Sequence, residues 1–185
     1  RILEKRHIFK NVISQINALY EKSPVLGRHD VIYRLISQNE FEKIQKDLCF
    51  TQDKKYSTAE NAKWFYYGHG KPGVENSYAC KIICREGTLN LIRDLTTDSE
   101  INTTALLTKE NEPDCVGIHE EMLAHFNLLI LRIEATHKSG KIFKVAFDHD
   151  SAVVENLAPK KAADDVLSYF QIPKVTPPYN SPSNK

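Results

Sequence analysis

The first hydrophobic pattern along the chain has the period of a helix. Apolar side chains recur every three or four residues at Phe9, Val12, Ile13, Ile16, Leu19 and Tyr20. This spacing is that of one face of an amphipathic helix, and Ser23-Pro24 is typical of a helix end. The pattern therefore predicts an N-terminal helix over residues 1–23.

A strand and a second helix follow. Residues 31–35, Val-Ile-Tyr-Arg-Leu, are β-branched and aromatic, which favours a strand. Ser37 and Glu40 have the spacing of a capping box at a helix start. The apolar residues after them predict a helix that carries Phe41, Ile44 and Leu48.

A second capping box is formed by Ser57 and Glu60. It predicts a short helix over residues 62–67, which include Trp64, Tyr66 and Tyr67. The glycines of residues 68–73 then predict a loop.

The second half of the chain contains three segments with strand patterns. Alternation over residues 78–84 places Tyr78, Cys80, Ile82 and Cys84 on one side of a strand. Residues 128–135 and 142–147 flank a turn at Thr136-His137-Lys138-Ser139-Gly140 and predict a hairpin. Pro159 favours the start of a final helix, and the prolines after residue 172 predict a tail or linker over 173–185.

Length and composition restrict the fold and the partners. The chain has 185 residues, 41% of them hydrophobic and 26% charged, as in a globular protein. We expect a single catalytic domain over residues 1–172, of the α+β class, because irregular strands and helices alternate without a repeat. The formal net charge of +1 argues against a nucleic-acid partner. No apolar stretch approaches the ~20 residues of a membrane span.

Three residues combine a reactive side chain with a defined position. Arg34 lies near the end of the first strand, Ser57 at a strand-to-helix corner, and Glu121 within residues 118–123. Each also has a structural interpretation: Arg34 as a surface strand residue, Ser57 as a helix cap, and Glu121 as a solvated acid. Their order along the chain favours a functional interpretation.

Three short motifs follow one another along the chain: Tyr33-Arg34, Tyr56-Ser57-Thr58-Ala59 and His119-Glu120-Glu121-Met122-Leu123-Ala124-His125. Their order resembles that of the motifs of the bacterial mono-ADP-ribosyltransferase toxins. The signature of this family is Arg, then Ser-Thr-Ser, then X-x-Glu, and the last segment is similar to that of its pertussis-toxin-like members. Ala59 replaces the last serine, and His119 stands where the family usually has Gln or Glu. Arg34 and Ser57 are also closer together in sequence than in the toxins. The resemblance covers approximately residues 32–147 and implies a split β-sandwich with flanking helices.

The resemblance implies NAD as co-substrate and assigns a role to each motif. Arg34, next to Tyr33, would pair with the pyrophosphate of NAD or fix the backbone around it, since a guanidinium fork matches phosphate. Glu121 would bind a ribose hydroxyl and stabilise the oxocarbenium-like transition state. Ser57 would orient that carboxylate.

The resemblance also implies where the rest of NAD and the acceptor bind. Thr58 belongs to the second motif, and Tyr66 is a candidate, with Trp64 and Tyr67, to stack on the nicotinamide ring. His119 takes the position that contacts the acceptor side chain and would accept a proton near neutral pH, or only pack.

The expected function is transfer of ADP-ribose from NAD to a protein side chain, with release of nicotinamide. The family implies a soluble bacterial effector or toxin domain, secreted and acting on a target protein in another cell. Two alternatives stay open: an inactive domain of the same fold that binds a protein partner, and an unrelated α+β domain.

Other chemistries fit less well. His119 and His125 are six residues apart, which is not the spacing of zinc ligands on one helix face, so no metal site is expected. In residues 68–73 Pro72 stands where a phosphate loop needs Ser or Thr. The four cysteines contain no CxxC pair and are expected to be thiols.

Overall fold

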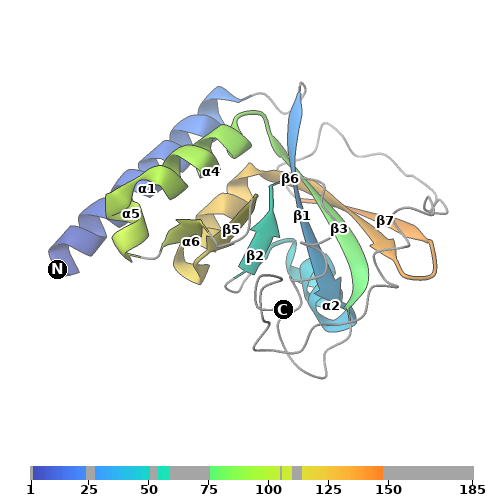
Figure 1. The fold of residues 1–185 in the computed structure, drawn as a ribbon. Helices are drawn as coiled ribbons and strands as arrows, with labels where there is room; N and C mark the ends of the chain where they lie inside the picture. Colours follow the sequence, from blue (N-terminus) through green and yellow to red (C-terminus); the bar gives the residue numbers. More distant parts are fainter. Residues whose placement is uncertain are drawn as a thin grey trace.

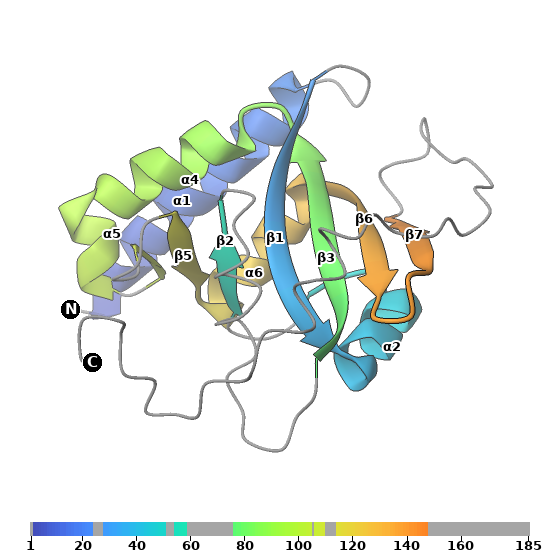
Figure 2. The same cartoon turned by 45° about the vertical axis from the view of Figure 1, so that its right-hand side comes forward.

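The computed structural model of the protein describes residues 2–23, 28–50, 54–58, 76–104, 106–109 and 114–147. They form an antiparallel seven-stranded sheet with helices packed against it, an α+β architecture (Figure 1). The strand order is β4-β5-β2-β1-β3-β6-β7. Helices α1, α4, α5 and α6 gather near the β4–β5–β2 end of the sheet, and α2 lies near the other end (Figure 2).

The predicted N-terminal helix is α1, Ile2–Lys22. Its apolar stripe packs into the core, where Val12 and Ile16 are fully buried. The helix ends at Lys22, and the carbonyl of the next residue, Ser23, accepts a hydrogen bond of 2.7 Å from Arg85 Nη1. The Arg85 guanidinium also lies 4.4 Å from the centroid of the Tyr20 ring. These contacts join the end of α1 to the end of the central strand β3.

The predicted strand and capped helix are β1, His29–Ser37, and α2, Gln38–Asp47. Ser37 is the N-cap, and its hydroxyl accepts a 3.2 Å bond from the Glu40 amide, as the capping-box spacing predicted. The buried Phe41 stacks on Tyr78 of β3 with ring centroids 3.9 Å apart. The capped helix is thereby packed on the sheet.

Strands β3, Asn76–Arg85, and β6, Ile130–His137, complete the centre of the sheet. The predicted hairpin is confirmed, because β6 pairs with β7, Ile142–Ala146. Gly140 closes its turn with a φ of 99°, which glycine adopts without strain. The predicted alternation of β3 is also confirmed, since Tyr78, Cys80, Ile82 and Cys84 all belong to the core.

The connection between the two halves of the sheet is narrow. In the described residues β1 and β2, Lys54–Ser57, are joined in register at Tyr33 and Ser57. By contrast, β1 and β3 are paired along their whole length, from His29–Arg85 to Ser37–Asn76. The sheet thus consists of a three-stranded part, β4-β5-β2, and a four-stranded part, β1-β3-β6-β7.

Several elements were not predicted from the sequence. They are α4 (Thr88–Thr97), α5 (Ser99–Thr104), β4 (Leu107–Lys109), β5 (Cys115–Ile118), α6 (Glu120–Phe126) and the 3-10 helix η1 (Asn127–Leu129). The segment around Glu121 is therefore the start of a helix.

Some predictions lie outside the described residues. They are the helix over 62–67 with Tyr66, the loop over 68–73, the final helix after Pro159 and the tail over 173–185. Among the helices that the structure does describe, none is long and apolar enough to cross a membrane.

Candidate functional site

The three segments that carry the sequence motifs lie side by side in the sheet. Arg34 belongs to β1, Ser57 ends β2, and Glu121 follows β5, while the strand order contains β5-β2-β1 as consecutive neighbours. Ser57 is 1% exposed. It lies opposite Tyr33 on one side and opposite Cys115 on the other. Residues far apart in the sequence therefore meet around Ser57.

The register determines which side chains share a face. Residues directly opposite each other in an antiparallel pair project to the same face, and successive residues alternate. Ser57, Tyr33 and Cys115 consequently share one face of the sheet. Arg34 and Tyr56 project to the other, where the Arg34 guanidinium lies 5.8 Å from the centroid of the Tyr56 ring. Arg34 and Ser57 are thus neighbours in the sheet but project to opposite faces.

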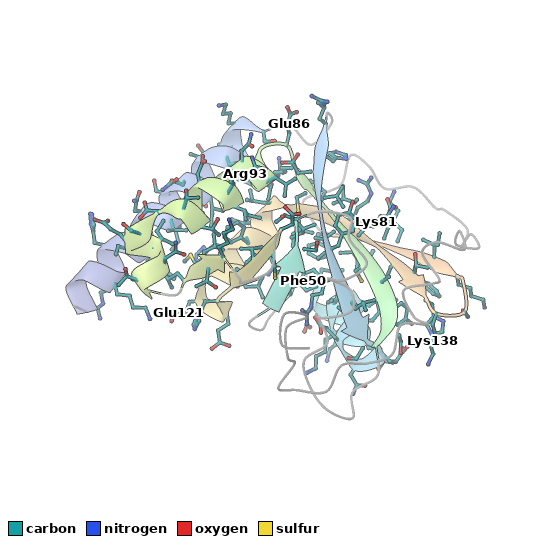
Figure 3. All side chains as sticks on the ribbon, in the orientation of Figure 1. Phe50, Lys81, Glu86, Arg93, Glu121 and Lys138 are labelled. Atoms are coloured by element: carbon teal, nitrogen blue, oxygen red, sulfur yellow. The ribbon has the colours of Figure 1, made fainter. Side chains whose placement is uncertain are left out.

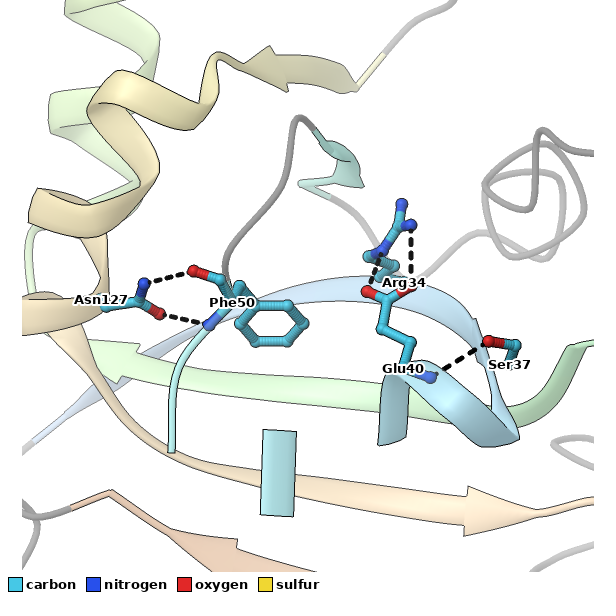
Figure 4. A network of polar contacts seen from close by, with 5 residues as sticks. All are labelled: Arg34, Ser37, Glu40, Phe50 and Asn127. Atoms are coloured by element: carbon cyan, nitrogen blue, oxygen red, sulfur yellow. Dashed lines mark hydrogen bonds and ion pairs between the residues drawn. The ribbon is translucent and has the colours of Figure 1, made fainter. Parts of the chain in front are cut away.

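Arg34 is held by a carboxylate of its own chain. Its Nε lies 3.2 Å from Glu40 Oε2, and its Nη2 lies 3.3 Å from Glu40 Oε1 (Figure 4). Arg34 is 6% exposed, so this two-point ion pair is largely screened from water. The pair joins β1 to the first turn of α2, a role that fixes the backbone around Arg34.

Tyr56 lines the buried surroundings of this ion pair. Its hydroxyl finds no hydrogen-bond partner among the described residues. Burial is the main cause that raises the pKa of Tyr56, partly offset by the Arg34 guanidinium. The phenol therefore stays neutral and packs beside the guanidinium.

Glu121 lies at the start of α6, at some distance along the strands from Ser57. Ser57 pairs with Cys115, at the beginning of β5, whereas the end of β5, Ile118, pairs with Lys54 at the beginning of β2. Glu121 comes three residues after Ile118, beyond the opposite end of this strand pair. The structure therefore does not bring Glu121 together with Ser57 in the described residues.

The contacts of Glu121 are those of a surface residue. Its carboxylate Oε1 lies 3.5 Å from Lys5 Nζ and 3.7 Å from His119 Nδ1, and its side chain is 46% exposed. Figure 3 shows Glu121 on the outer side of α6. His119 is the N-cap of this helix, and its Nδ1 accepts a hydrogen bond from the Glu121 amide. Capping gives His119 a structural role that the sequence had left open.

The residue that precedes Cys115, the register partner of Ser57, also carries a carboxylate. Asp114 immediately precedes Cys115, and its carbonyl oxygen accepts bonds from the Thr58 amide at 2.7 Å and from Thr58 Oγ1 at 3.0 Å. Asp114 has a φ of 61°, in the left-handed region that aspartate tolerates better than most residues. Asp114 was not among the site residues predicted from the sequence. The Pro-Asp pair at 113–114 is a turn signal that could have indicated a bend before β5.

The segment before β2 is held by the side-chain amide of Asn127, which bonds to backbone groups as a second peptide group would. Asn127 Oδ1 accepts from the Phe50 amide at 2.9 Å, and Asn127 Nδ2 donates to the Phe50 carbonyl at 2.7 Å (Figure 4). Both groups are buried. Asn127 thereby ties η1 to the chain that leads into β2 and Ser57.

The described residues contain no group of three or more His, Cys, Asp and Glu side chains able to hold a metal ion. The four cysteines are free thiols, and Cys80, Cys84 and Cys115 are buried. Comparisons with protein-family models, curated proteins and solved structures found no match to this chain.

Proposed function

We propose that the chain is an NAD-dependent mono-ADP-ribosyltransferase that modifies a side chain of a target protein. The observation that carries the proposal is the adjacency of β1, β2 and β5, the three strands that hold or lead into the three motifs. The narrow junction between β1 and β2 also suits a split sheet. Both features agree with the fold that the resemblance implies.

The reaction breaks the bond between the ribose C1′ and the nicotinamide nitrogen, and the bonding electron pair leaves with nicotinamide. A nucleophile on the target protein then forms the new bond to C1′ and loses its proton. The transition state resembles an oxocarbenium ion, so a carboxylate beside the ribose lowers the barrier. In this proposal Ser57 orients that carboxylate, and Tyr33 and Thr58 border the donor.

Arg34 contributes through the backbone in this proposal. Glu40 already occupies its guanidinium fork, so its part is to hold β1 and the start of α2 in place. The proposal includes action as a secreted bacterial effector or toxin domain, the setting that belongs to the family it resembles.

The test is release of nicotinamide from NAD, with and without cell extract as a source of acceptor. Slow release in water and faster release with acceptor are expected, because both nucleophiles share one transition state. The variants Glu121→Gln and Asp114→Asn test which of these two carboxylates stabilises the transition state. Loss of the working carboxylate should lower turnover by about 100-fold, as for other preorganised electrostatic groups. Glu120→Gln, an exposed neighbour, is the matched control.

A second candidate is a domain of the same fold that binds a protein partner without catalysis. It is favoured by the position of Glu121, which pairs with Lys5 and does not lie beside Ser57. Absence of nicotinamide release from the folded protein, with and without extract, would contradict the transferase and favour this binder. Calorimetric titration with NAD separates the transferase from an unrelated α+β domain, for which no NAD binding is expected.

A further inference from the structure

A cavity of about 270 Å³ lies between α4 and the ends of β2, β4 and β5. One side of it is a single face of α4, with the spacing i, i+3, i+4, i+7 and i+8 at Leu89, Ile92, Arg93, Thr96 and Thr97. The opposite side contains Lys109 and Val116, which are register partners on β4 and β5. Thr58, Asp114 and Cys115 complete the lining.

The lining is too polar for a gap in the hydrophobic core. Leu89, Ile92 and Val116 supply an apolar part, but the same cavity is lined by two cations, Arg93 and Lys109, and by Asp114. Within the described residues no ion pair joins either cation to Asp114. Figure 3 shows Arg93 on α4. Its Nη1 donates to Asn90 at 3.0 Å, and the guanidinium has further N–H donors.

Three threonine hydroxyls on the lining use their hydrogens on backbone carbonyls. Thr96 Oγ1 donates to the Arg93 carbonyl at 3.0 Å, and Thr97 Oγ1 donates to the Asp94 carbonyl at 2.9 Å. Thr58 Oγ1 donates to Asp114 in the same way. A hydroxyl whose hydrogen is engaged still offers its oxygen lone pairs. These oxygens and the Asp114 carboxylate are acceptors, whereas Arg93 and Lys109 are donors.

A ligand that complements this lining has an anionic group for the two cations and several hydroxyls for the acceptors. We propose that the cavity binds a small sugar phosphate, with its phosphate at Arg93 and Lys109 and its hydroxyls at Asp114 and the threonines. Arginine and lysine are the side chains that bind phosphate best in proteins. Ligand pockets commonly have volumes of roughly 300–1,000 Å³, so this cavity suits one sugar ring with a phosphate and is small for a dinucleotide.

This inference goes beyond the proposed transferase. The cavity shares Thr58 and Asp114 with the proposed donor site but involves neither Arg34 nor Glu121, and its test contains no NAD. A protein that releases no nicotinamide would leave the inference intact, and a protein that binds no sugar phosphate would leave the transferase intact.

The test is calorimetric titration of the full chain with ribose 5-phosphate, with inorganic phosphate and with ribose. Ribose 5-phosphate should bind in a saturable manner and more tightly than either fragment, because only it engages both cations and acceptors. Arg93→Gln and Lys109→Gln should each weaken its binding by about tenfold, the effect of losing one charge-assisted hydrogen bond. Asp114→Asn should weaken binding of ribose 5-phosphate more than that of inorganic phosphate.

Lys141→Gln is the matched control, because it makes the same charge change in the β6–β7 hairpin at the opposite edge of the sheet. It should leave the affinity unchanged. All substituted cations are exposed, so far-ultraviolet circular dichroism should show every variant folded. The proposal is overturned by absence of saturable binding at millimolar ribose 5-phosphate. Equal losses in Lys141→Gln and Arg93→Gln would overturn it too, since they indicate only a general effect of net charge.

Discussion

Arg34 occupies a core position of β1, between Ile32 and Ile36 on the same face. Burying a charge is costly unless the charge is paired and hydrogen-bonded, and Glu40 supplies both oxygens for that purpose. The sequence predicted that Ser37 caps α2, which is confirmed. It could not predict that the Glu40 carboxylate also pairs with Arg34, because this depends on how α2 folds back on the sheet.

The first prediction tests this ion pair. Glu40→Gln should lower the free energy of unfolding by about 3 kcal/mol, because it removes the carboxylate that pairs with the buried Arg34 guanidinium. Chemical denaturation measures the change. Glu42→Gln, on the same helix and exposed, removes the same charge and should change stability by less than about 0.5 kcal/mol. Similar small effects of both substitutions would show that the pair is not important for folding.

At the scale of elements, the helices that were not predicted have N-terminal caps that cannot be recognised from the local sequence. Gly87 is the N-cap of helix α4, and Asp30 of β1 accepts from the amides of Gly87 at 3.0 Å and of Leu89 at 2.9 Å. Helix α6 is capped by His119, which is outside the residues usually preferred at an N-cap. Strands β4 and β5 are too short for a recognisable alternation. By contrast, α1, α2 and the hairpin carry their signals within their own residues, and their prediction is confirmed.

The second prediction concerns the attachment of η1 to the segment before β2. Asn127→Ala removes both bonds to Phe50 and leaves a buried amide and a buried carbonyl unpaired, so it should destabilise the fold by about 2–4 kcal/mol. Asn127→Asp keeps an acceptor for the Phe50 amide and loses the donor to its carbonyl.

Two measurements check this attachment. Denaturant unfolding gives the loss of stability, and hydrogen exchange of the Phe50 amide should become faster in Asn127→Ala than in the unsubstituted protein. Asn11→Ala, in an exposed position of α1, is the control and should leave this amide protected. Unchanged exchange at Phe50 in Asn127→Ala would contradict the role of Asn127.

At the scale of the whole molecule, the candidate site depends on pairings between distant segments. The residue types of 31–35 predicted β1, and Ser57 was expected at the end of a strand; the structure places β1 and β2 next to each other. The position of Glu121 relative to Ser57 depends on the register of β2 with β5 and on the helix that follows β5. A one-residue change of register would reverse every side chain, so the composition of the site could not be derived from motif spacing alone.

Three acidic groups of the core retain their protons at a pH at which the unfolded chain loses them. Burial raises the pKa of the Cys80 and Cys84 thiols and of the Tyr56 hydroxyl. An unfolded thiol titrates near pH ~8.5 and an unfolded tyrosine near pH ~10. Below pH ~8.5 both states hold these protons, so this contribution to stability is fully present and does not depend on pH. Above it the unfolded state binds fewer protons, and the free energy of unfolding falls as pH rises.

The last prediction follows from this difference. Between pH 8.5 and 10 each of the two thiols should contribute a decrease of up to about 1.4 kcal/mol per pH unit, measured by denaturant unfolding with a reductant present. The double variant Cys80→Ala/Cys84→Ala should lose this part of the slope, whatever its stability at pH 7. Cys49→Ala is the control, because Cys49 is only partly buried and should contribute less of the slope. An unchanged slope in the double variant would show that the two core thiols reach the solvent before the protein unfolds.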